Sequence, residues 1–139
     1  MESKNCVFCA IIEGKMPVAK VFESEAILCF MDKYPINTGH TLVIPKKHYE
    51  SFLDMSENEV AELYITVSRI AKASIKSLHA DGFNVGQNNG RAANQIVPHV
   101  HVHIIPRFIS DNNNGRWPSR KIESQHELEI AAGKISRYY

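Results

Sequence analysis

The chain has 139 residues, of which 44% are hydrophobic and 22% are charged, proportions that suit one globular domain with its own core. The formal net charge of +1 at pH 7 excludes a general electrostatic attraction to nucleic acid or to a membrane surface. No apolar run approaches the length of a membrane span, and the first five residues lack the apolar core of a signal peptide, so we expect a cytoplasmic protein.

The first third of the chain is expected to contain a short helix and three strands. In order, the expected elements are a helix at 6–13, strands at 18–22 and 26–31, a loop at 32–39 and a strand at 41–45. Gly14 ends the helix, and the polar turn at 23–25 separates the first two strands. Pro45 ends the third strand, because proline has no N–H to donate to a neighbouring strand.

The rest of the chain is expected to add a long helix, two strands and a last helix. The long helix is the clearest element, because Ser56 and Glu59 form a capping box and apolar residues then recur at helical spacing as far as Leu78. After it come a strand at 82–87, a polar loop at 88–95, a strand at 98–106, an irregular segment at 107–120 and a helix at 123–139. These elements predict a single α+β domain with a mostly antiparallel sheet of about five strands.

The strand predicted at 98–106 carries His99, His101 and His103 in alternation with Val and Ile. Alternate residues of a strand lie on one face about 6.6–7 Å apart, so the three imidazoles are expected in a row. A lone histidine in a strand is usually a surface or core residue, but three in strict alternation favour chemistry, since imidazole is a nucleophile, proton carrier and metal ligand. Clustered imidazoles also disfavour protonation of one another, which keeps the nucleophilic neutral form.

Other polar residues are expected near this row. Asn88 and Gln95 belong to the loop that precedes the row, where side-chain amides can orient phosphate oxygens. His40 directly precedes the strand at 41–45, so its side chain can contact the histidine row from a neighbouring strand. The sequence has no Gly-rich P-loop and no carboxylate pair next to the row. This pattern favours attack on phosphorus by a histidine, with neighbouring imidazoles and amides stabilising the charge.

Several separated motifs resemble the histidine triad (HIT) family. Its signature, His-x-His-x-His followed by apolar residues, stands here as His99-Val-His101-Val-His103-Ile-Ile. The further matching motifs, in chain order, are Cys6-Val-Phe-Cys9, Phe30-Met-Asp32, Gly39-His40-Thr-Leu-Val-Ile-Pro-Lys-Lys-His48 and Asn88-Asn-Gly90. The resemblance is to the Hint-like branch and implies a single HIT-like domain over 1–139, with 1–108 matched best and 109–139 of uncertain role.

The resemblance implies a hydrolase or transferase that acts on a purine nucleotide at its α-phosphate. It implies that His101 is the nucleophile, flanked by His99 and His103, and that His40 is a supporting histidine. It further implies phosphate contacts for Asn88 and Gln95, ribose contacts for Asp32, and a base pocket lined by Phe8 and Phe30. Core packing is the alternative for the two aromatic residues, and turn formation is the alternative for Asp32.

Three positions depart from the family pattern. Lys33 is basic where members of the branch often have an apolar side chain, a change expected to shift base or ribose selectivity or to favour an additional phosphate. Asn94 stands where members often have glycine, and Ile96 stands where some Hint members carry a hydroxyl residue that helps to protonate an amine leaving group. The change at Ile96 weighs against efficient phosphoramidase activity more than against phosphate binding. The substrate classes that remain are nucleoside phosphoramidates, acyl-adenylates and dinucleoside polyphosphates. The alternative is a nucleotide-binding or scaffolding module without significant turnover.

The cysteines indicate a metal site rather than disulfides. Cys6-x-x-Cys9 has the spacing of a zinc ligand pair, and a thioredoxin-like role is disfavoured because no βαβ pattern follows. His48 and His99 are the candidates for the other two ligands, and some members resembling this chain hold zinc with such a set. A closed Cys₂His₂ set predicts a structural zinc ion; reduced thiols without metal, and a catalytic zinc ion, are the alternatives.

The resemblance also implies a symmetric homodimer whose sheets join. The aromatic residues Trp117, Tyr138 and Tyr139 belong to the segment that matches the family least. They are candidates for the dimer contact or for substrate specificity, because aromatic side chains are enriched at interfaces. Packing on their own domain is the alternative.

Overall fold

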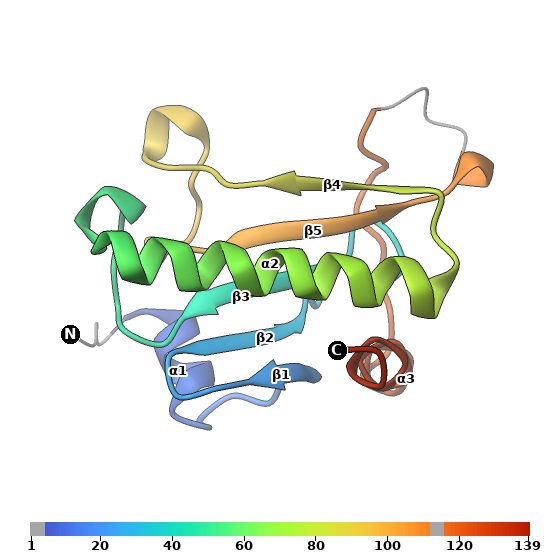
Figure 1. Cartoon of the computed structure of the whole chain (residues 1–139), viewed down its shortest axis with the longest axis horizontal. Coiled ribbons are helices and arrows are strands. Elements are labelled where there is room, and N and C mark those ends of the chain that lie inside the picture. Colours follow the sequence, from blue (N-terminus) through green and yellow to red (C-terminus); the bar gives the residue numbers. More distant parts are fainter. Residues whose placement is uncertain (1–4, 112–115) are drawn as a thin grey trace.

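The computed structural model describes residues 5–111 and 116–139 (Figure 1). Its centre is a five-stranded sheet in the order β1-β2-β3-β5-β4, in which every neighbouring pair is antiparallel. The strands are β1 Lys20–Glu23, β2 Ile27–Met31, β3 Thr41–Pro45, β4 Gly82–Gly86 and β5 Val102–Arg107. The predicted α+β class, the antiparallel sheet and the strand number are confirmed.

Helices lie on both faces of the sheet. The long helix α2 (Glu57–Leu78) crosses one face, and α3 (Gln125–Ser136) packs beside it against β1 and β2 (Figure 1). The short helix α1 (Val7–Ile12) lies on the opposite face. Short 3₁₀ turns occupy Phe52–Asp54, Arg91–Ala93 and Ile109–Asp111. None of the helices in the described part of the chain combines the length and apolar character needed to cross a bilayer.

The two faces of the sheet bury separate apolar clusters. Towards α2, side chains of β3 and β5 such as Val43, Val102 and Ile104 pack with residues of α2 and α3. Towards α1, Phe8 and neighbouring residues of the helix pack on the other face of β2 and β3. Because β2 and β3 are covered on both sides, all of their residues are buried, which explains their continuous apolar sequences.

The strand predicted at 98–106 begins only at Val102, so His99 and His101 precede β5 and only His103 lies in it. The partner strand β3 ends at Pro45, and the Pro45 carbonyl accepts a hydrogen bond from the His99 ring instead of from a strand backbone. The predicted alternation of faces is nevertheless present. Val100, Val102 and Ile104 all point into the cluster under α2, which places the histidines on the opposite face.

Other element limits differ by a few residues. The first strand is Lys20–Glu23 rather than 18–22, and β4 ends at Gly86 rather than at residue 87. The last helix begins at Gln125, because Ser124 and Glu127 form a second capping box. Tyr139 stacks on Phe22 with ring centroids 4.0 Å apart, so this aromatic residue packs on its own domain.

Candidate active site and metal centre

The three histidines form a continuous row between β5 and α1. His99 and His101 are buried, while His103 is half-buried. The Phe8 ring of α1 meets both His99 and His101 edge-on, with centroid separations of 5.8 and 5.1 Å. His101 and His103 follow with centroids 5.1 Å apart. The structure therefore brings together the three side chains that the alternation predicts, although two of them lie outside the strand.

The hydrogen bonds of His101 leave one ring nitrogen free to act as a nucleophile. Its Nδ1 lies 2.7 Å from the carbonyl oxygen of His99, so Nδ1 carries the proton and donates it to that carbonyl. In the neutral ring Nε2 then keeps its lone pair. Burial lowers the pKa of His101 below its ordinary value, which maintains the neutral form at pH 7.

A second chain of hydrogen bonds sets the tautomer of His103. The backbone N–H of Ile36 donates to Nδ1 of His40 at 3.0 Å, so the His40 proton is on Nε2. That nitrogen donates to Nδ1 of His103 at 2.9 Å, so the His103 proton is on Nε2. Burial lowers the pKa of His40 to about 4 and that of His103 to about 3. A nucleophilic lone pair and an N–H donor therefore occur on adjacent imidazoles, His101 and His103.

The predicted phosphate-binding amides lie in the loop before the row. Gln95 binds backbone groups around it: Oε1 accepts from the N–H of Gly90 at 2.7 Å, and Nε2 donates to the carbonyl of Glu50 at 2.8 Å. Asn88 is exposed and donates to the carbonyl of Asn94 at 3.3 Å. Gln95 thus stabilises the loop, and the phosphate contacts of both residues stay predictions.

The residues predicted to bind base and ribose come from α1, from β2 and from the loop after β2. Phe8 and Phe30 are buried and pack edge-on at 5.7 Å, so both belong to the core on this face, and Phe8 also contacts His101. Asp32 lies in the loop after β2, with Oδ2 at 3.6 Å from Nε2 of His40. Lys33 is exposed beside the Tyr34 ring.

Arg120 contacts the predicted site residue Asp32, and sequence reasoning missed this contact. Arg120 comes from the irregular segment after β5, and its Nη1 lies 3.2 Å from Oδ2 of Asp32. Nothing in the composition of that segment distinguishes this arginine from its neighbours. The residues are 88 positions apart, so only the fold brings them together.

Cys6, Cys9, His48 and His99 converge as a four-ligand group. Nδ1 of His99 is 3.4 Å from Sγ of Cys6, and Nδ1 of His48 is 3.3 Å from Sγ of Cys9. The two Nδ1 atoms lie 3.1 Å apart. A tetrahedral zinc ion with bonds of about 2.0–2.3 Å holds its ligand atoms about 3.3–3.8 Å apart, so these three distances fit zinc to within a few tenths of an ångström. All four ligand atoms lie within 4.8 Å of one another.

The protonation of His99 also fits a metal ligand. Its Nε2 donates to the Pro45 carbonyl at 2.8 Å, which leaves the lone pair of Nδ1 facing the two cysteines. Burial raises the pKa of the Cys6 thiol, so a bound cation would itself have to stabilise the thiolate. With four protein ligands the group has no open position, as expected of a structural site.

Asp32, His40 and His103 form a second group of possible ligands within residues 5–111 and 116–139. Here Nδ1 of His40 is occupied by the N–H of Ile36, and Nε2 of His40 carries the proton shared with His103. A metal ion bound there would have to displace that proton and break this series of hydrogen bonds. This group is therefore better suited to holding protons than to holding a metal.

Comparisons with known proteins agree with this geometry. The HIT domain family model matches residues 13–109. An uncharacterized HIT-like protein of Methanocaldococcus jannaschii is 48% identical over 106 residues, which cover 76% of this chain and 81% of that protein. The adenosine 5′-monophosphoramidase of Schizosaccharomyces pombe is 38% identical over 133 residues, which cover 95% of this chain and 96% of that protein.

A solved structure of a similar protein has the same fold. The crystal structure of a Zn-bound histidine triad family protein from Mycobacterium smegmatis superimposes with a TM-score of 0.84 at 36% identity, covering 99% of this chain and 94% of that one. The residues matched by the family model include the histidine row, and the match covers most of the chain. The chain therefore belongs to the HIT family.

Proposed function

We propose that the protein is a nucleotide hydrolase or transferase that acts at the α-phosphate through a covalent intermediate on His101. The observation that carries the proposal is the hydrogen bond from Nδ1 of His101 to the His99 carbonyl, which leaves Nε2 as a neutral nucleophile. The neighbouring N–H of His103 suits a non-bridging phosphate oxygen. The similarity to a fission yeast phosphoramidase supports the same class of reaction.

The reaction proceeds in two displacements. Nε2 of His101 attacks phosphorus, a P–N bond forms, and the bond to the leaving group breaks with its electron pair going to that group. The His99 carbonyl stabilises the positive charge on the nucleotidyl-imidazole through the Nδ1 proton, and His103 donates to the phosphate oxygen that gains charge. Water then attacks the same phosphorus, releases the nucleoside monophosphate and a proton, and restores neutral His101.

The candidate substrates are nucleoside phosphoramidates, acyl-adenylates and dinucleoside polyphosphates. An amine leaving group needs a proton as it departs, whereas a carboxylate or a phosphate leaves as a stable anion. Ile96 is 79% exposed and has no proton to donate. We therefore rank acyl-adenylates and dinucleoside polyphosphates above phosphoramidates as substrates. Adenine is ranked above other bases because of the family resemblance.

The test is release of AMP from adenosine phosphoramidate, an acyl-adenylate and diadenosine polyphosphate by the natural chain and by His101→Ala. If the natural chain releases AMP and the variant does not, while AMP still binds to the variant, the result supports His101 as the nucleophile. Equal release by both proteins contradicts it. Absence of release from every substrate, with AMP still bound, favours the alternative of a nucleotide-binding module.

We also propose that Cys6, Cys9, His48 and His99 hold a structural zinc ion. Cys6 caps α1 and Cys9 lies in it, His48 follows β3 and His99 precedes β5, so a bound ion would fasten three separate segments of the chain to one point. Phe8 lies between the two cysteines in sequence and contacts His101. The ion would thereby also hold α1 against the nucleophile, while taking no part in the chemistry.

We further propose that the protein is a cytoplasmic homodimer. Strand β4 is the last strand of the sheet, so one of its edges has no partner within the described chain. Beside this edge, an apolar depression between α2 and β4 is lined mainly by Tyr64, Val67, Ile75, Phe83 and Val85. Joining two β4 edges would extend the sheet and cover this surface, which supports a two-fold dimer.

A further inference from the structure

The C-terminal segment after the family-matched residues 13–109 reaches the candidate nucleotide site through Arg120. The Arg120 guanidinium donates to Oδ2 of Asp32 at 3.2 Å and to the carbonyl of Tyr34 at 2.6 Å. The arginine side chain is half exposed, whereas the Asp32 carboxylate is only 13% exposed. A single guanidinium nitrogen, Nη1, thus joins a carboxylate and a backbone carbonyl of the same loop.

The position of Arg120 is set by contacts on both sides of it. Upstream, Arg107 of β5 donates to the carbonyl of Arg116 at 2.7 Å. Downstream, the backbone N–H of Lys121 donates to the Pro35 carbonyl at 2.7 Å, and its side chain donates to Asn37 at 3.3 Å. The segment is therefore fastened to β5 and to the loop after β2, and Arg120 is already placed before any substrate binds.

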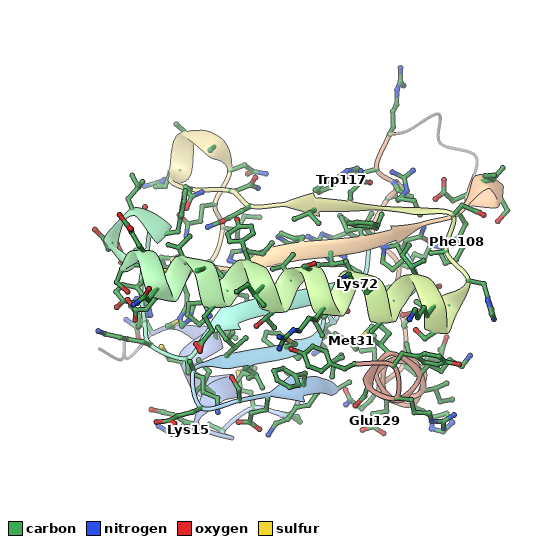
Figure 2. The ribbon with its side chains drawn as sticks, in the orientation of Figure 1. Lys15, Met31, Lys72, Phe108, Trp117 and Glu129 are labelled. Carbon is green, nitrogen blue, oxygen red and sulfur yellow. The ribbon has the colours of Figure 1, made fainter. Side chains whose placement is uncertain are left out.

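Between these points Trp117 lies against β4, as Figure 2 shows. Its ring edge stands 3.3 Å from the place where a Cβ of Gly86 would be. Gly86 pairs with His103 across the β4–β5 ladder. The segment that carries Arg120 thus passes close to the histidine row as well as to Asp32.

The lone pairs of Asp32 show what Arg120 contributes. Oδ1 accepts from the backbone N–H of Tyr34 at 2.9 Å, and Oδ2 accepts from Arg120. Each carboxylate oxygen has two lone-pair positions, so one remains on each oxygen. His40 takes neither, because its Nε2 is 3.6 Å away and its proton goes to His103. Two adjacent acceptors remain, which match the two hydroxyl donors of a vicinal diol.

We propose that Arg120 is a positioning residue that fixes the Asp32 carboxylate for the 2′- and 3′-hydroxyls of a ribonucleotide. The inference rests on the proposed function, since it takes the nucleotide site beside the histidine row as given. Without Arg120, the second oxygen loses its fixed partner and the carboxylate can rotate, because this terminal torsion is broad. The negative charge of Asp32 also loses its compensation beside a negatively charged phosphate.

The test combines two changes, one in the protein and one in the substrate. Arg120→Met and Arg120→Lys are compared with the natural chain on an adenosine 5′-phosphate ester of the class that proves active, and on its 2′,3′-dideoxy analogue. Arg116→Met is the matched control, because it removes a cation from the same segment and the contact of Arg116 with Arg107 is made by its backbone. Thermal unfolding of each variant checks that the fold is intact.

Arg120→Met is expected to lower kcat/KM for the ribonucleotide about tenfold, mainly through KM, as loss of one charge-assisted hydrogen bond implies. On the dideoxy analogue the same variant is expected to change kcat/KM less than about twofold, since the diol contact is absent there. Arg120→Lys should fall between, because it keeps the charge but on a shorter side chain that reaches Asp32 less well. An equal loss on both substrates, or no loss on either, overturns the proposal.

Binding measurements separate this inference from the proposed function. The Kd values of AMP and of 2′,3′-dideoxy-AMP are measured by calorimetry for the natural chain and for Arg120→Met. A preference for AMP that disappears with Arg120 supports the inference even if no substrate is hydrolysed. Hydrolysis without any preference for the diol leaves the proposed function standing and refutes the role of Arg120.

Discussion

Gly39, which directly precedes His40, is the position at which a single methyl group should be most harmful. Its φ of +85° lies in the left-handed region, which costs any residue with a Cβ about 1–2 kcal/mol. A Cβ there would also collide with Cδ1 of Leu78 and stand 3.0 Å from Cγ of Pro106. Crowding of this kind in a packed site typically costs about 1–3 kcal/mol more.

Gly39→Ala is therefore expected to lower the free energy of unfolding by about 3 kcal/mol, a large share of the about 5–15 kcal/mol of a typical domain. With a urea m-value near about 2 kcal/mol per molar, the unfolding midpoint should fall by about 1.5 M. Gly14→Ala is the matched control, because Gly14 also has a positive φ, +77°, but nothing lies within 4 Å of its added Cβ.

The control should lose only the backbone contribution of about 1–2 kcal/mol. The difference between the two variants then measures the crowding against Leu78 and Pro106. If Gly39→Ala is no less stable than Gly14→Ala, the close approach of α2 and β5 to this turn is not as described, and the argument fails.

Three further predictions concern the metal, the pH dependence and the assembly. Cys9→Ser is expected to abolish stoichiometric zinc and to lower the unfolding temperature, as measured by metal analysis and calorimetry; unchanged zinc content would contradict the four-ligand group. Burial holds the pKa of His40 at about 4, against 6.5 unfolded, with His103, Asp32 and Arg120 around it. On acidification, His40 is therefore protonated in the unfolded chain before it is protonated in the folded chain. Its contribution to the free energy of unfolding is fully present above pH 6.5 and falls by about 3 kcal/mol towards pH 4. The urea midpoint of the natural chain should fall as the pH is lowered over this range, and that of His40→Asn should fall less. A midpoint of the natural chain that does not change with pH would refute this prediction. Phe83→Glu is expected to convert the dimer to a monomer in light scattering, and a dimer that persists would argue against the β4 surface.

Local sequence patterns were enough to predict much of the fold. The capping box at Ser56 and the apolar spacing to Leu78 predict α2 to the residue, because a helix is specified by contacts within four positions. The alternation at 99–104 correctly separates the face of Val100 and Val102 from the face of the histidines. It does not reveal that β5 begins only at Val102, because that depends on the end of the partner strand at Pro45.

The sequence by itself determined the inventory of the site: a triad of imidazoles, a cysteine pair at metal-ligand spacing and their membership of one domain. Only the tertiary structure decided how these groups are used. The tautomer of His103 depends on the His40 ring, 63 positions away in the sequence, which packing brings to 2.9 Å. The contact of Arg120 with Asp32 spans 88 residues in a segment without a periodic pattern. Local propensity acts over a few residues, whereas such contacts exist only once the whole chain has packed.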